Sequence, residues 1–169
     1  MTSRHPSSPI FVQVPGLSGR LSLWHFPAKS HLLEAAAAGC NMIVTLQGVT
    51  EDPNIKTLPV VCQETRMEWI QIDWWKNYFQ HAGAQGHPAI IKLLEEIVNS
   101  VRRGHTVLLH CAAGVHRTGM CVYGVLRRLG MSRNETLDFI KQLRLITYEN
   151  CGMNRFDEME RKCQQWFKN

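Results

Sequence analysis

The chain has 169 residues, which is enough for one domain and too few for two, since domains average roughly 150 residues. Hydrophobic residues make up 44% and charged residues 20%, which excludes disordered, collagen-like and coiled-coil chains. The net charge of +5 favours anionic partners but is too small to indicate nucleic-acid binding. No apolar run approaches the roughly 18 residues of a membrane span, and no signal core follows Met1. We therefore expect no membrane span and a cytoplasmic location, with the nucleus as an alternative.

The first elements in chain order follow a serine- and proline-rich start. We expect residues 1–18 to form a loose lead-in and residues 19–169 to form a single domain. The alternation of Leu21 and Leu23 around a serine predicts a short strand. A helix is expected over residues 30–38, before a glycine.

Three further apolar runs predict buried strands, at residues 41–46, 69–72 and 106–110. The last run is apolar on both faces, as a central parallel strand should be. Between the second and third of these runs, Pro88 can open a helix whose apolar residues recur on one face up to Val101. This order of strand, helix and strand is typical of a right-handed crossover.

The second half of the chain is predicted to be helical. One apolar helix runs past Thr118 to Gly130, and Ser132 with Glu135 forms a capping box that opens another. A last helix is expected from Met153 towards the C-terminus. The sequence thus predicts an α/β fold with a central, mainly parallel sheet of four to five strands and helices on both faces.

Six cysteines are present, without a Cys-x-x-Cys pair or a His-Glu-x-x-His motif. We therefore expect no metal and no other cofactor, and we expect reduced thiols. Apart from one nucleophile, the cysteines should be buried apolar residues; the six are Cys40, Cys62, Cys111, Cys121, Cys151 and Cys163.

The loop after the strand at 106–110 has the composition of an anion site. It joins the carboxyl end of a strand to the start of a helix, where backbone N–H groups and the helix dipole converge on one point. Arg117 can hold two oxygens of a phosphate with its planar fork. Gly114 permits the tight backbone turn. We expect phosphate or sulfate to bind in this loop.

Cys111 lies at the base of the same loop, where N–H dipoles and the guanidinium favour a thiolate. We interpret it as a nucleophile. Thr118 can donate a hydrogen bond to the sulfur when the sulfur is the leaving group, and His110 can fix the loop through a ring N–H.

The run His110-Cys111-x5-Arg117-Thr118-Gly119 resembles the signature of the cysteine-dependent protein tyrosine phosphatase superfamily. The short chain is similar to the compact atypical dual-specificity branch, including members of the kinase-associated type. The resemblance implies a dual-specificity phosphatase-like fold and a phosphocysteine intermediate. It also implies that the loop residues bind the substrate phosphate, namely Ala112, Ala113, Gly114, Val115, His116 and Arg117.

A general acid must reach this loop from another segment, and Asp73 is the candidate. It is the only acidic residue between Glu68 and Glu95 and follows a predicted strand, as the general acid does in similar phosphatases. The alternative is a surface turn residue that caps the next segment. Trp74 and Trp75 follow, and we expect them to anchor this loop in the core rather than to line the site. The segment at 81–87 is expected to be an insertion.

The loop residues Ala112, Ala113 and Val115 add no charge beside Arg117. Such a loop favours a singly phosphorylated side chain over a polyphosphate. We therefore expect a phosphoprotein substrate carrying phosphotyrosine, with phosphoserine and phosphothreonine as further candidates. Two alternatives remain open at this point. One is an inositol phosphate or phosphoinositide phosphatase, and the other is a phosphoprotein-binding module without turnover.

Overall fold

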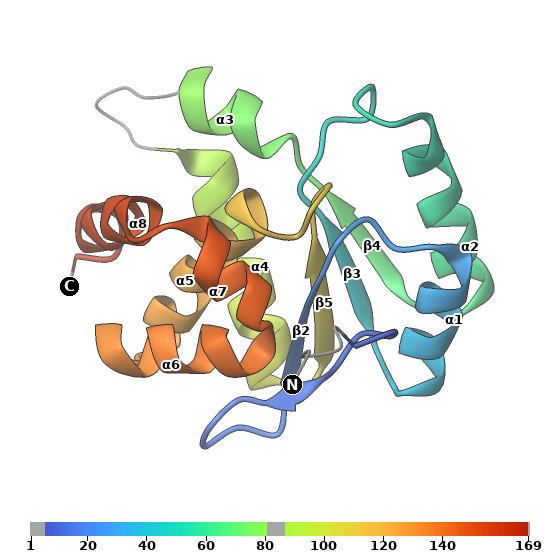
Figure 1. The fold of residues 1–169 in the computed structure, drawn as a ribbon, viewed down its shortest axis with the longest axis horizontal. Coiled ribbons are helices and arrows are strands. Elements are labelled where there is room, and N and C mark those ends of the chain that lie inside the picture. The colour runs from blue at the N-terminus through green and yellow to red at the C-terminus, as the bar shows by residue number, and fades with distance from the viewer. Residues whose placement is uncertain (1–5, 81–86, 169) are drawn as a thin grey trace.

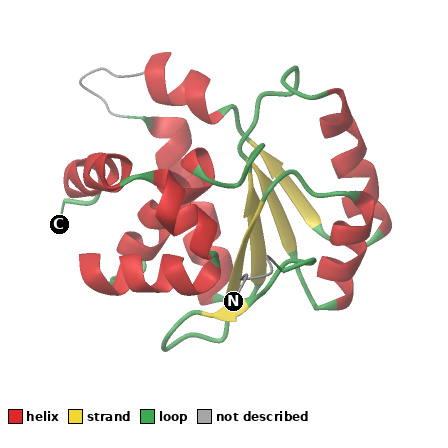
Figure 2. Cartoon of the chain, viewed as in Figure 1, coloured by secondary structure: helices red, strands yellow, loops and turns green. Residues whose placement is uncertain are grey.

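The computed structural model describes residues 6–80 and 87–168. Within them, five strands form one sheet in the order β1-β2-β5-β3-β4. Only β1 is antiparallel to its neighbour, so four strands end at the same edge of the sheet (Figure 2). The strands are β1 Val12–Gln13, β2 Arg20–Trp24, β3 Met42–Thr45, β4 Glu68–Gln71 and β5 Thr106–His110.

Helices cover both faces of the sheet (Figure 1). Helices α1 and α2 lie on one face, and α4 to α8 lie on the other. The bounds of the helices are α1 Lys29–Ala37, α2 Leu58–Glu64, α3 Trp74–Gln80, α4 Pro88–Arg102, α5 His116–Arg128, α6 Arg133–Leu143, α7 Leu145–Cys151 and α8 Met153–Trp166; a 3-10 turn spans Pro53–Thr57. The predicted fold class is therefore confirmed.

The central strand β5 is buried along its whole length because helices cover both of its faces. Successive side chains alternate between two cores. Leu108 packs with Ile43 beneath α1 and α2, whereas Val107 and Leu109 belong to the larger core beneath α4 and α5. A continuous apolar run is what a strand needs when both faces are covered.

Most predicted elements are found within a few residues of their expected bounds. The capping box of α6 is present, since Ser132 Oγ accepts from the Glu135 amide and the Glu135 carboxylate accepts from the Ser132 amide. Helix α5 begins at His116, slightly before the predicted start. Within the stretch expected as a lead-in, β1 pairs with β2.

Three short helices were not predicted, namely α2, α3 and α7. The insertion expected at 81–87 falls mainly outside the described residues. All six cysteines are buried, as expected for the five that were not assigned a role in catalysis. Among the described residues, no helix has the length and apolar character needed to cross a bilayer.

Candidate active site

The loop at residues 111–115 joins the end of β5 to the start of α5. Val115 is the N-cap of this helix and makes no side-chain capping bond. The first N–H groups of a helix have no partner within the helix, and here no capping side chain takes their place. The N-terminus of α5 is therefore available to an anion, and the helix dipole favours negative charge there.

The carbonyl groups of the loop are held by donors outside it. His110 Nδ1 bonds to the Cys111 carbonyl at 3.2 Å, and the Phe26 amide donates to the Ala112 carbonyl at 2.9 Å. Phe26 follows β2, the neighbouring strand, so the parallel sheet itself brings this donor to the loop.

The next two carbonyls are held from the start of α7. Arg144 Nη1 donates to the carbonyls of Ala113 at 3.0 Å and Gly114 at 2.9 Å. Thr147 Oγ1 also donates to the Gly114 carbonyl, at 2.6 Å. The start of α7 therefore supports the loop through these hydrogen bonds.

These bonds orient the amides of the loop. In a trans peptide the N–H points opposite to the C=O of the same plane. Four successive carbonyls are fixed towards the surrounding protein, so the following N–H groups face the other way. These N–H groups belong to Ala112, Ala113, Gly114 and Val115. The arrangement is an amide cradle suited to a tetrahedral oxyanion.

Gly114 is required by the geometry of this cradle. Its φ is +67°, in the left-handed region, and a Cβ at this position would overlap the Trp24 carbonyl oxygen. Both the backbone angle and the contact exclude other residues.

Cys111 is 3% exposed at the base of the cradle. Thr118 Oγ1 donates to its Sγ at 3.1 Å, from the first turn of α5. A hydroxyl in this position stabilises negative charge on sulfur, whether the thiolate is a free nucleophile or a leaving group.

Arg117 is held by an acidic residue that the sequence did not indicate. Its Nη1 donates to both carboxylate oxygens of Glu51 at 2.8 Å and approaches the Leu46 carbonyl at 3.4 Å. The Gly48 amide donates to Glu51 Oε1 at 3.0 Å. Burial alone would raise the pKa of Glu51, but the bonds from Arg117 and Gly48 outweigh burial and lower that pKa. The ion pair therefore persists to acidic pH and positions the guanidinium.

His110 belongs to a chain of hydrogen bonds that ends at the backbone carbonyl of Cys111. A carbonyl can only accept, so His110 Nδ1 carries the proton that bonds to the Cys111 carbonyl. The neutral ring then accepts at Nε2 from the Thr45 hydroxyl, 2.7 Å away, and Thr45 Oγ1 accepts from Trp69 Nε1 at 2.9 Å. Burial lowers the pKa of His110 to about 4, against the carbonyl bond, which raises it.

The lowered pKa of His110 predicts a pH-dependent stability. An unfolded histidine has a pKa near 6.5, so between about pH 6.5 and 4 the unfolded chain binds a proton that the folded chain excludes. The free energy of unfolding should therefore fall as pH drops through this window, by on the order of 3 kcal/mol from His110 alone. Urea titrations of wild type and His110→Gln at pH 7 and 4.5 measure this contribution. The pH-dependent loss should shrink in His110→Gln but not in the control His105→Gln, and an equal loss in all three proteins would contradict it.

Asp73 lies at the start of α3, where its Oδ1 accepts from the Lys76 amide at 3.1 Å. It therefore caps the following segment. Its carboxylate also lies against Gly48, since a Cβ on that glycine would be 2.5 Å from Asp73 Oδ2. This contact places Asp73 beside the loop that carries Glu51, the partner of Arg117.

A pocket of about 330 Å³ opens above Cys111. Trp75 lines this pocket, whereas Trp74 is fully buried at 0% exposed. Trp74 anchors the core as expected. Trp75 also packs against the core, but it lines the pocket as well, which we did not expect. The pocket residues are Trp75, Cys111, Ala112, Ala113, Val115, His116, Arg117 and Asn150.

The structure brings most of the predicted site residues into one place. The loop residues, Thr118 and His110 surround Cys111, and Asp73 does not line its pocket. The sequence did not indicate the supporting residues because they come from distant segments without a motif. These residues are Phe26, Thr45, Glu51, Trp69, Arg144, Thr147 and Asn150.

The chain is similar to known proteins in sequence and in fold. A model described as the tyrosine phosphatase family matches residues 42–139, more than half of the chain. Protein 123R of Invertebrate iridescent virus 6, which carries a tyrosine phosphatase name, is 28% identical over 79 residues. That match covers 46% of this chain and 56% of the viral protein, so it spans about half the length of that relative.

Solved structures share the fold, among them two phosphatases. Kinase associated phosphatase, with a serine in place of its catalytic cysteine, superposes with a TM-score of 0.70 at 13% identity, covering 96% of this chain and 97% of that one. The core catalytic domain of the PP-IP phosphatase SIW14 from S. cerevisiae has a TM-score of 0.57 at 19% identity, covering 89% and 83%.

The solved structures share the α/β fold of this chain, and the family model covers the loop that carries Cys111. With the family model matching over half of its length, the chain belongs to the tyrosine phosphatase family.

Proposed function

We propose that this chain hydrolyses phosphorylated protein side chains, phosphotyrosine above all, through a phosphocysteine intermediate. The observation that carries the proposal is the setting of Cys111. Its Sγ accepts from Thr118 at 3.1 Å at the base of an uncapped helix N-terminus, beside a loop whose amides face inward. A nucleophile and an oxyanion site in one place are what phosphoryl transfer requires.

The reaction has two displacement steps. In the first, the Cys111 thiolate attacks phosphorus, the S–P bond forms, and the P–O bond to the side chain breaks. The departing oxygen takes a proton from the Asp73 carboxyl group. In the second, Asp73 takes a proton from water as the water oxygen attacks phosphorus, and the S–P bond breaks to return the thiolate. Arg117 and the loop amides hold the equatorial oxygens in both steps.

The pocket walls favour a singly phosphorylated aromatic side chain. Ala112, Ala113 and Val115 add no charge next to Arg117, so the loop complements one phosphate better than several. Trp75 on the pocket wall offers an aromatic face to a substrate ring.

A second candidate is hydrolysis of inositol phosphates, favoured by the structural likeness to the PP-IP phosphatase SIW14. The exposed His116 of the loop would lie next to such a ligand. The likeness concerns the fold, and the uncharged loop favours the protein substrate.

A substrate panel tests the proposal. Purified protein is assayed for phosphate release from a phosphotyrosine peptide, the matched phosphoserine and phosphothreonine peptides, and soluble inositol phosphates. The highest kcat/KM is expected for the phosphotyrosine peptide. Faster turnover of inositol phosphates would favour the second candidate, and phosphopeptide binding without release would identify a binding module.

Asp73→Asn should slow the reaction in a way that depends on the leaving group. Without a proton donor, the loss with a tyrosyl phosphate should be roughly a hundredfold or more, and far smaller with an aryl phosphate whose phenolate leaves unaided. Steady-state kinetics with both substrates measure the difference. Asp52→Asn is the control, because its carboxylate caps the 3-10 turn at Pro53–Thr57. An equal loss for both leaving groups would make Asp73 a structural residue.

A further inference from the structure

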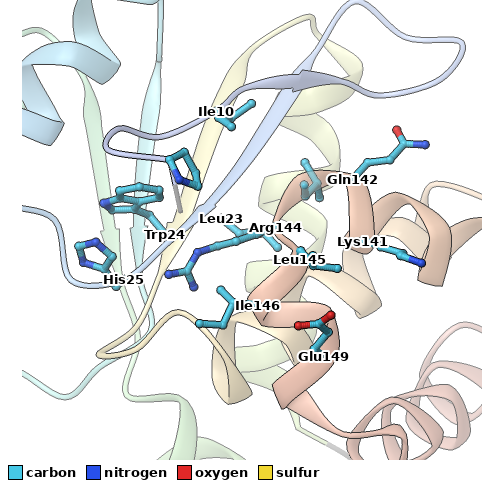
Figure 3. A pocket seen from close by; sticks show the side chains of 12 residues that line it. Ile10, Leu23, Trp24, His25, Lys141, Gln142, Arg144, Leu145, Ile146 and Glu149 are labelled. Atoms are coloured by element: carbon cyan, nitrogen blue, oxygen red, sulfur yellow. The ribbon is translucent and has the colours of Figure 1, made fainter. Parts of the chain in front are cut away.

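A second and larger pocket lies behind the catalytic loop, on the side of α7. Its volume is about 490 Å³, within the range of roughly 300–1,000 Å³ that is usual for small-molecule sites. It is formed where the N-terminal segment and β2 face the end of α6 and the start of α7 (Figure 3). Nothing in the proposed phosphatase reaction uses this pocket.

The walls of the pocket are mainly apolar. Leu23, at the floor, is 1% exposed, while Ile10 and Leu145 remain 50% and 43% exposed. Figure 3 shows Ile146 on the same side of the pocket as Leu145, below Arg144. Exposed aliphatic side chains around a cavity favour binding of an apolar group, because the ligand removes them from water.

Arg144 brings one cation to this apolar surface. Its guanidinium carbon lies 5.6 Å from the centre of the Trp24 ring, and burial lowers the pKa of Arg144. The hydrogen bonds that the Arg144 side chain makes to the described residues are all donated by Nη1, to Ala113, Gly114 and Thr147. A guanidinium has five N–H donors, so its Nε and Nη2 edge can bind a second group.

The charges around the pocket select a monoanion. Lys141 and Glu149 both line it and offset each other, which leaves the charge of Arg144. Burial is the main reason why the pKa of His25 is lowered. This neighbour of Arg144 is therefore neutral at pH 7 and adds no charge. The Glu149 carboxylate disfavours a dianion such as a phosphate monoester. A single carboxylate attached to an apolar body matches both the walls and the charge.

We propose that this pocket binds a small amphipathic carboxylate, whose carboxylate pairs with the Nε and Nη2 edge of Arg144 and whose apolar tail lies against Leu23, Leu145 and Ile146. The site is separate from the phosphate cradle, and Arg144 touches both. The proposal holds whichever substrate the cradle takes.

Calorimetric titration with octanoate tests the site, with octanol as the uncharged ligand of the same chain length. Saturating tungstate is present throughout to occupy the catalytic loop. Octanoate is expected to bind one to one with a Kd of about 1 mM or lower, and octanol at least about tenfold more weakly, because a charge-assisted hydrogen bond is lost.

Two pocket variants, Leu145→Asp and Ile10→Asp, should each weaken octanoate binding by about tenfold or more, since each puts a negative charge beside the ligand. The matched control is Leu33→Asp, which alters a leucine of similar exposure, 45%, on α1. It should bind octanoate as wild type does. All three positions are exposed, so the fold should tolerate the change, and thermal unfolding checks this.

An absence of binding to wild type at about 10 mM, equal binding of octanol, or unchanged binding in both pocket variants would overturn the proposal.

Discussion

Cys111→Ser is expected to abolish turnover, lowering kcat by roughly a thousandfold or more. A serine hydroxyl in this setting is not ionised at neutral pH, so no nucleophile remains for the first displacement. The phosphate cradle should survive, because its amides are fixed by bonds from Phe26, Arg144 and Thr147 that the substitution does not touch. Tungstate should therefore still raise the melting temperature of the variant, as a ligand selective for the folded state does.

The control for this experiment is Cys121→Ser. It alters a second buried cysteine, which lies in α5. Its burial raises the pKa of Cys121, so this thiol stays protonated and unreactive. The control should lose stability and keep kcat. Turnover of Cys111→Ser above a hundredth of the wild-type value would reject Cys111 as the nucleophile. Loss of the tungstate effect in Cys111→Ser alone would mean that the sulfur, rather than the amides, holds the anion.

Arg117→Lys is expected to lower kcat/KM by about a hundredfold or more, although the charge is kept. The planar fork can contact two equatorial oxygens at once, and these bonds tighten in the transition state, whereas an ammonium is a point charge. Glu51→Gln should give a smaller loss, about tenfold, because Arg117 would keep its charge and lose the carboxylate that positions it at 2.8 Å.

Steady-state kinetics on a phosphotyrosine peptide measure both losses. Glu64→Gln, at the exposed C-terminal end of α2, is the control and should behave as wild type. Near-normal kinetics in Arg117→Lys would show that the fork geometry is not used. A loss in Glu51→Gln as large as in Arg117→Lys would instead make Glu51 part of the chemistry.

The sequence predicted the elements whose signals are local. The apolar run at residues 106–110 and the serine–glutamate pair that opens α6 each specify their structure within a few residues. Helix α3 was missed because its seven residues are mostly aromatic, a composition that has low helix propensity, and packing around Trp74 and Tyr78 stabilises it. Helix α7 is equally short and has no side-chain cap.

The same distinction applies to the site. Cys111, Arg117 and Thr118 stand in one short run, so their spacing alone indicates a cradle on a helix N-terminus. Glu51 lies 66 residues from its partner Arg117, and Arg144 lies about 30 residues from its partner Gly114. Each is one of many charged side chains in the sequence. Only the sheet order and the position of α7 make these two residues part of the site.

The central position of β5, between β2 and β3, has a consequence for hydrogen exchange. Parallel neighbours on both sides take up the backbone groups of this strand, and Val107, Leu108 and Leu109 are 0% exposed. Their amide hydrogens can reach solvent only when the whole domain opens. Strand β5, which ends directly before Cys111, should therefore be among the last segments to exchange with heavy water, so the base of the pocket should keep its shape when other parts of the domain open locally.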